Sequence, residues 1–128
     1  MTNSELNELS GKIVASAIEV HRNMGPGLLE KIYEKYMIEE LTLRGIHAEQ
    51  QVHVPLIYKG VELDSSYQID ILVEDEVILE LKAVTEHHPL FDAQIISYLK
   101  LADKRLGLLL NFHVPLMKSG IKRFVNGI

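Results

Sequence analysis

Two acidic side chains and a lysine, Asp70, Glu80 and Lys82, lie near one another in the middle of the sequence. They belong to a segment, 67–83, whose apolar residues alternate with others as in two β-strands joined by a short acidic turn. Because side chains on a strand alternate between its faces, Glu80 and Lys82 point the same way. Two carboxylates beside a lysine offer oxygen ligands only, which suit Mg²⁺ or Mn²⁺ better than zinc.

The length of the turn decides whether the side chain of Asp70 lies on the same face of the sheet as that of Glu80. With a three-residue turn, Glu74-Asp75-Glu76, Asp70 lies directly opposite Glu80, whereas a two-residue turn puts the two carboxylates on opposite faces. We predict the three-residue turn. Opposed carboxylates beside apolar strands repel and are partly desolvated, and a divalent cation removes both penalties. The same spacing also fits a solvated polar face of an antiparallel sheet that binds no ion.

Composition limits the class of protein. The 128 residues fit one domain, 1–128, of ordinary hydrophobic content, and the absence of cysteine excludes disulfides and thiolate metal sites. The sequence predicts no signal peptide and no membrane span, so we expect a cytoplasmic protein without membrane contact. A net charge of −5 argues against a domain built mainly to grip nucleic acid, although a local basic patch can still bind phosphates.

The elements around the acidic hairpin follow from hydrophobic periodicity. Apolar steps of three and four predict helices over 4–22, capped by Ser4, and over 28–44. Alternation predicts a strand over 46–58, in which Pro55 indicates an edge position or a strand end, and a short return strand leading to Asp70. A helix over 90–103 and a buried strand over 106–112, parallel to the Glu80 strand, complete the order. The expected buried stripe of the second helix comprises Leu28, Leu29, Ile32, Tyr33, Tyr36 and Met37.

Other polar side chains can reach the same region. Glu30 lies on a flank of the second helix, and Gln94 and Tyr98 lie four residues apart beside the buried stripe of the third. By itself, Glu30 is better explained as a first-turn acid that complements the helix dipole.

The combination of these features resembles a known family. The chain contains G-L-L-E-K-I-Y at 27–33, then Asp70, then E-L-K at 80–82, then Gln94 with Tyr98, and a closing L-L-N-F strand. In this order and on these elements, the set resembles the GxxExxY proteins of the PD-(D/E)XK nuclease-like superfamily. The likeness covers nearly the whole chain and favours the metal-binding interpretation over the solvated face. It implies an α/β, restriction-endonuclease-like core of α-β-β-β-α-β order with a mixed sheet flanked by helices.

The resemblance also implies a function and residue roles. The function is hydrolysis of phosphodiester bonds in DNA or RNA with Mg²⁺ or Mn²⁺, with nucleic acid as the partner and a homodimer as one arrangement. Asp70, Glu80 and the backbone carbonyl of Leu81 would ligate the metal. Lys82 would orient or deprotonate the attacking water and stabilise charge on the phosphate.

The resemblance also implies roles for residues of the predicted helices. Glu30 fits the additional acid that the first core helix supplies, and Gln94 fits the polar residue that positions phosphate or water. Tyr98 and Tyr33 are the expected substrate contacts.

Two other functions remain open from the sequence. A non-catalytic nucleic-acid-binding or protein-interaction module can keep the same fold, since function belongs to the site rather than to the fold. A small-molecule or nucleotide hydrolase is the third. The presence of Asp70, Glu80 and Lys82 together favours the nuclease, because a pure binding module does not need all three.

Overall fold

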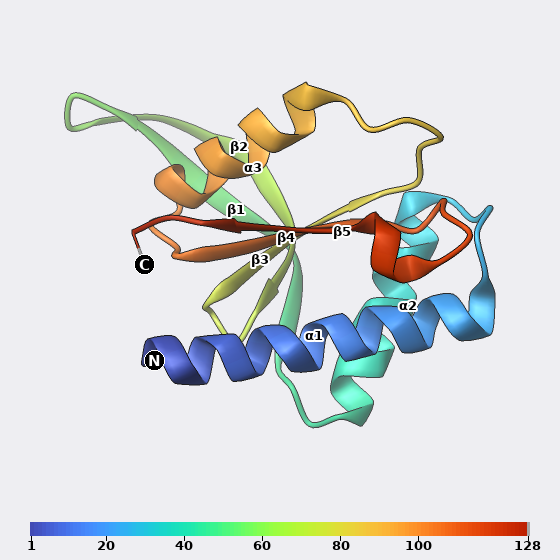
Figure 1. Cartoon of the computed structure of the whole chain (residues 1–128). Coiled ribbons are helices and arrows are strands. Elements are labelled where there is room, and N and C mark those ends of the chain that lie inside the picture. The colour runs from blue at the N-terminus through green and yellow to red at the C-terminus, as the bar shows by residue number, and fades with distance from the viewer. Residues whose placement is uncertain (128) are drawn as a thin grey trace.

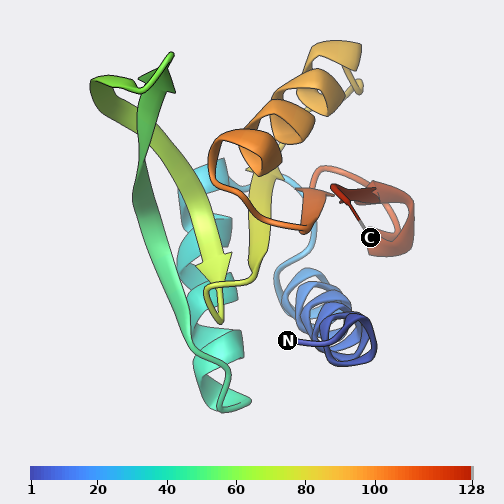
Figure 2. The same ribbon diagram turned by 90° about the vertical axis from the view of Figure 1, so that its left-hand side faces the viewer.

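A mixed β-sheet separates two helices on one face from a third helix on the other (Figures 1 and 2). The computed structural model describes residues 1–127, except the side chains of 65 and 66. Its helices and strands follow in the order α1 (Asn3–Met24), α2 (Glu30–Leu43), β1 (Ala48–Tyr58), β2 (Val61–Val73), β3 (Val77–Lys82), α3 (Pro89–Leu101), β4 (Leu106–Asn111), a 3₁₀ turn η1 (Met117–Gly120) and β5 (Ile121–Val125). From α2 to β4 this is the expected α-β-β-β-α-β order, so the predicted fold class is confirmed.

The sheet runs β1-β2-β3-β4-β5, and its central pairing positions the acidic residues. Strands β2 and β3 are antiparallel, and Val73 pairs with Val77. The turn between them therefore has three residues, as predicted, and the same register places Asp70 opposite Glu80. Strand β4 is parallel to β3, which is also as predicted, and pairs Asn111 with Lys82. Strand β5 closes one edge against β4, while β1 forms the other edge.

The two faces of the sheet have separate hydrophobic clusters. The larger cluster joins α1 and α2 to the sheet, with Ile13, Met37 and Leu79 completely buried. The smaller one joins α3 to the opposite face through Leu99 and Ile78. The same strands thus bury side chains on both faces, which explains why β3 and β4 are apolar along almost their whole length.

The simple alternation predicted for β2 is wrong at one point. Tyr67 and Ile69 pack in the cluster below α3, whereas Ile71 packs in the cluster below α1 and α2. The break coincides with Gln51, whose φ of 51° interrupts the β1–β2 ladder between the pairs Gln50–Ile71 and Val52–Ile69. A residue with positive φ inside a strand changes the direction of the side chains beyond it. Asp70 lies at this irregularity, and its charge contributes to raising the pKa of both Glu80 and Tyr67.

Two details of the helices also differ from expectation. Thr2 rather than Ser4 caps α1, in a capping box with Glu5. On α2, Leu29 is 75% exposed and Tyr36 is 38% exposed, so the buried stripe is shifted along the helix. The buried residues of α2 are Tyr33, Glu34, Met37 and Leu41. Helix α2 begins only at Glu30, with Leu29 as its N-cap, so Leu28 and Leu29 lie outside the helix.

Candidate active site

Asp70 and Glu80 approach each other across the β2–β3 ladder. The backbone N–H of Leu81 donates to Oδ2 of Asp70 at 2.9 Å, which fixes that carboxylate beside β3. Glu80 is only 7% exposed, because β3 is an inner strand covered by α3. Two acidic groups, one of them buried, are therefore neighbours, and the backbone of β3 holds the carboxylate of Asp70.

Glu80 is the most strongly perturbed acid of the site. Burial first, and then the charge of Asp70 and a hydrogen-bond contact with it, raise the pKa of Glu80 from 4.5 to about 9. Tyr67 and Lys82 oppose the shift without overcoming it. At neutral pH, in the absence of a cation, the Asp70–Glu80 pair therefore retains a proton.

Tyr67 holds the outer oxygen of this pair, a role that the sequence interpretation missed. Its hydroxyl donates to Oε1 of Glu80 at 2.8 Å. Its ring stacks on that of Tyr98, with centroids 3.9 Å apart. Burial and the charge of Glu80 raise the pKa of Tyr67 above its ordinary range, so the hydroxyl remains a donor. The clue in the sequence was a tyrosine three residues before Asp70, but regular alternation put it on the other face.

A small pocket opens beside the acidic pair, between β3 and α3. It is lined by Glu80, Lys82, Phe91, Gln94, Ile95, Tyr98 and Leu109. The ammonium group of Lys82 lies 4.4 Å from the centroid of the Phe91 ring, in the position of a cation–π contact. Gln94 and Tyr98 lie one helical turn apart and both face the pocket. The structure thus brings Lys82, Gln94 and Tyr98 together with Glu80.

Glu34, rather than Glu30, is the α2 carboxylate that is coupled to the pair. Burial raises the pKa of Glu34, and the charge of Asp70 adds to the effect. Glu34 is 5% exposed and accepts a hydrogen bond from Nε2 of Gln51 at 2.9 Å. Glu30 is the first residue of α2, one turn earlier, and makes no described contact with Asp70 or Glu80. The sequence does contain a signal for this burial, because Glu34, Met37 and Leu41 are spaced by three and four residues and so lie on one face of the helix.

Tyr33 does not reach the pocket. It is completely buried on the other face of the sheet, where its ring stacks on Phe112 with centroids 4.4 Å apart. Its hydroxyl donates to the carbonyl of Gly25 at 2.6 Å and accepts from the N–H of Leu28. The tyrosine therefore orders the loop before α2, and the structure does not support its predicted substrate contact.

Asn111 fixes the segment that follows Lys82. Its side chain accepts from the N–H of Val84 at 3.1 Å and donates to the carbonyl of the same residue at 3.0 Å. The carbonyl of Lys82 also accepts from the N–H of Phe112 at 3.0 Å. These contacts tie the end of β3 to the end of β4, so the backbone beneath Lys82 is rigid. Asn111 is a second positioning residue that the sequence interpretation did not assign.

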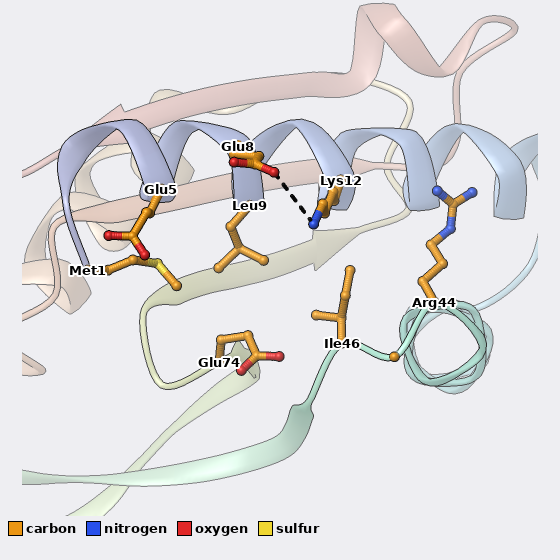
Figure 3. Close-up of a pocket in the computed structure, with 9 residues that line it drawn as sticks. Met1, Glu5, Glu8, Leu9, Lys12, Arg44, Ile46 and Glu74 are labelled. Carbon is orange, nitrogen blue, oxygen red and sulfur yellow. Dashed lines mark ion pairs between the residues drawn. The ribbon is translucent and has the colours of Figure 1, made fainter.

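A larger hollow lies elsewhere, between the start of α1 and the turn that joins α2 to β1 (Figure 3). Its charged side chains are engaged in other contacts. Lys12 pairs with Glu8 at 3.8 Å, Arg44 with Glu40 at 2.7 Å, and Glu74 accepts from the N–H of His47. These contacts stabilise helix ends and a turn, so we assign the candidate site to the pocket below α3.

The donor set at Asp70 and Glu80 fits a hard divalent cation. Among the described residues no cluster of three or more acidic or histidine side chains is tight enough to hold an ion alone. Two carboxylates and one backbone carbonyl leave several coordination positions for water and substrate, as Mg²⁺ prefers. A dication would also replace the proton that the pair retains at neutral pH.

The fold and this site define a class of protein: a mixed sheet whose second strand places Asp70 beside Glu80 of the third, with Glu80 and Lys82 lining one pocket. The model of the PD-(D/E)XK nuclease superfamily matches residues 7–124, and the chain belongs to that superfamily. Its nucleases generally use divalent metals. No curated protein and no solved structure matches the chain. Within residues 1–127, no helix has the length and apolar character to cross a membrane.

Proposed function

We propose that this protein is a divalent-metal-dependent nuclease that hydrolyses phosphodiester bonds of DNA or RNA in the pocket below α3. One observation supports this most: Asp70 lies beside the buried Glu80, and Glu80 shares a pocket with Lys82. The closer likeness to the GxxExxY proteins, the organisation as one domain over 1–128 and a cytoplasmic location belong to the same proposal.

The metal-binding role falls to residues of β2 and β3. Asp70, Glu80 and the carbonyl of Leu81 would hold Mg²⁺ or Mn²⁺. A cation bound there polarises a phosphoryl oxygen and lowers the pKa of a bound water. Glu34 supplies the additional acid from the helix, a role for which Glu30 is the competing candidate.

The other pocket residues orient the reacting groups. Lys82 lines the pocket beside Glu80, where its ammonium form would donate hydrogen bonds to the phosphate and its neutral amine form would accept the proton of the attacking water. Gln94 and Tyr98 bind phosphate or water from α3. Tyr67 holds Glu80 in a fixed rotamer through its 2.8 Å hydrogen bond, so that the pair is preorganised for the cation.

Cleavage assays on single- and double-stranded DNA and on RNA, with Mg²⁺, Mn²⁺ or a chelator, test the proposal. Lys82→Met should lower the rate on the order of 10²–10⁴-fold, the usual contribution of a proton-transfer group. The exposed Lys35, also in a regular element, provides the matched Lys35→Met control, which should cleave normally. Metal-dependent cleavage that survives Lys82→Met would refute the assigned role.

The same experiment distinguishes a binding module from a nuclease. Isothermal titration with Mg²⁺ or Mn²⁺ should show binding to the wild type and its loss in Asp70→Ala. Metal-stimulated nucleic-acid binding without cleavage of any substrate would indicate the non-catalytic alternative. An absence of metal binding by the wild type would refute the metal site itself.

A further inference from the structure

A second polar cluster lies beside the candidate site, on the same face of the sheet. Lys122 of β5 pairs with Leu109 of β4, and Leu109 pairs with Glu80 of β3, so the three side chains form one row below α3. Neighbouring strands are about 4.8 Å apart, which puts the backbone of Lys122 roughly 10 Å from that of Glu80. The start of β5 and the loop that joins β3 to α3 lie at the same end of the sheet (Figure 1).

Asp92 of α3 joins this row to a histidine in the loop. Nζ of Lys122 donates to Oδ2 of Asp92 at 2.7 Å, and Nε2 of His87 lies 2.9 Å from Oδ1. Oδ1 is shielded from solvent and has no hydrogen bond to any other described group. A buried carboxylate oxygen requires a donor, so Nε2 of His87 carries a proton directed at it. These three residues, His87, Asp92 and Lys122, are called the His87 cluster below.

The two adjacent histidines of this loop have different environments. His88 is the N-cap of α3, and its Nδ1 accepts from the N–H of Leu90 at 3.0 Å. His87 is 41% exposed, and among the described residues only its Nε2 has a polar partner. Helix capping therefore accounts for His88, whereas the ring of His87 is fixed through one nitrogen and leaves Nδ1 available to a ligand.

Phe91 links the His87 cluster to the pocket. The centroid of its ring lies 4.4 Å from the ammonium group of Lys82 and 5.8 Å from the imidazole of His87, which meets it edge-on at 80°. The same phenyl ring lines the pocket together with Glu80. Lys82 and His87 therefore contact one aromatic side chain, and a nucleic-acid strand bound at Lys82 passes within reach of His87.

We propose that His87 binds a second phosphate of the substrate, about one to three nucleotides from the phosphate that is cleaved. This inference rests on the proposed nuclease function. A strand carries one phosphate about every 3.4 Å of helix axis, so several fall within the distance between Glu80 and Lys122. Lys122 balances the charge of Asp92, so the imidazolium of His87 gives the cluster a net positive charge. Asp92 is the positioning residue, because it holds Nε2 and leaves Nδ1–H to donate to a phosphate oxygen.

Charge favours an anion at this cluster. A chain with a net charge of −5 can hold a polyanion only through local cations, and the His87 cluster adds one beside Lys82. The approach of a phosphate also favours the charged imidazolium over the neutral ring. Because His87 lies away from the reacting atoms, the contact should strengthen substrate binding more than it accelerates the chemical step.

Neutralising one phosphate at a time tests the contact. The probes are the single- and double-stranded DNA and RNA oligonucleotides of the cleavage assay, each with one phosphate replaced by an uncharged methylphosphonate. Fluorescence anisotropy measures their binding to Lys82→Met with Mg²⁺, so that cleavage does not interfere. At one position near the cleaved bond, neutralisation should weaken binding roughly ten-fold, the contribution of a charge-assisted hydrogen bond. When His87→Ala is added, the same neutralisation should change binding little.

His47 provides a matched control. It is also exposed, and its Nε2 lies 3.1 Å from Oε1 of Glu49, but it lies at the other end of β3, beside the β2–β3 turn. His47→Ala should keep the full effect of each neutralised phosphate, whereas Asp92→Ala should behave like His87→Ala. In steady-state cleavage, His87→Ala should raise KM roughly ten-fold and change kcat little.

The outcomes separate this inference from the proposed function. Cleavage by the wild type, together with a phosphate scan that His87→Ala leaves unchanged, would overturn the inference and keep the nuclease. If His87→Ala weakens the binding of every probe by the same factor, its role is structural and the inference is also overturned. A wild type that neither binds nor cleaves any probe would refute the proposed function, and the inference with it.

Discussion

Replacing Glu80 by glutamine should stabilise the metal-free protein at neutral and alkaline pH. The buried carboxyl group of Glu80 is protonated in the folded protein because burial and Asp70 raise its pKa to about 9, against 4.5 when it is unshielded. Folding therefore takes up a proton between these two pKa values. The free energy of unfolding falls as the pH rises above 4.5, and the loss is complete above about 9.

The loss of unfolding free energy between about pH 5 and about pH 8 depends only weakly on the exact pKa of Glu80 in the folded protein. At about 1.4 kcal/mol per unit, the wild type loses on the order of 4 kcal/mol between about pH 5 and about pH 8, provided that the folded pKa of Glu80 stays at or above the upper pH. Glutamine has nearly the same shape, cannot ionise and still accepts the hydrogen bond of Tyr67. The Glu80→Gln variant should therefore lose about 4 kcal/mol less than the wild type over the same interval, since contributions from other groups cancel.

Thermal unfolding with a chelator present provides the assay. Near pH 8, Glu80→Gln should melt roughly 15 °C above the wild type, and the difference should shrink near pH 5. The exposed Glu39, in the variant Glu39→Gln, is the control and should melt with the wild type at both pH values. Added Mg²⁺ should raise the melting temperature of the wild type and raise that of Glu80→Gln much less. A Glu80→Gln protein that is less stable than the wild type near pH 8 would refute the electrostatic reasoning.

Two further predictions use matched pairs of variants. Glu34→Gln should weaken Mg²⁺ binding and cleavage by roughly ten- to hundred-fold, whereas Glu30→Gln should change both little, because only Glu34 is coupled to Asp70; the reverse order in titration calorimetry would restore Glu30 as the helix ligand. Gly120→Ala should destabilise the fold by more than about 2 kcal/mol, since the new Cβ would overlap the backbone carbonyl oxygen of Asn111. Gly11→Ala, with nothing within 4 Å in helix α1, should instead stabilise it by about 0.5–1 kcal/mol, and urea denaturation measures both.

Periodicity and turn length predicted the fold because each element carries a strong local signal. The three-residue turn at 74–76, the edge strand with Pro55 and the parallel strand after α3 all followed from patterns within short windows. Element boundaries moved by one to two residues at most of the helix ends, and the expected short return strand proved to be part of the long β2.

The site was less predictable because it departs from regular structure. The positive φ of Gln51 interrupts the ladder beside Asp70, and no composition rule marks glutamine for that conformation. Regular alternation therefore assigned Tyr67 to the wrong face. Glu34 was overlooked for a different reason: a buried glutamate is rare, and its burial depends on Gln51, which is distant in sequence.

The acidic pair lowers the stability of the fold, and packing elsewhere in the molecule has to compensate for it. In the metal-free chain the proton that Asp70 and Glu80 retain at neutral pH removes their mutual repulsion, but burial still makes ionisation of Glu80 costly. The two side chains cannot move apart, because Leu81 anchors Asp70 to β3 and the apolar faces of β3 are buried on both sides. The larger cluster below α1 and α2 supplies most of the burial that offsets this strain, although it takes no part in the pocket. A divalent cation bound at the proposed site would therefore remove a penalty already present in the fold, and this gain would help two carboxylates to hold it without a third tight ligand.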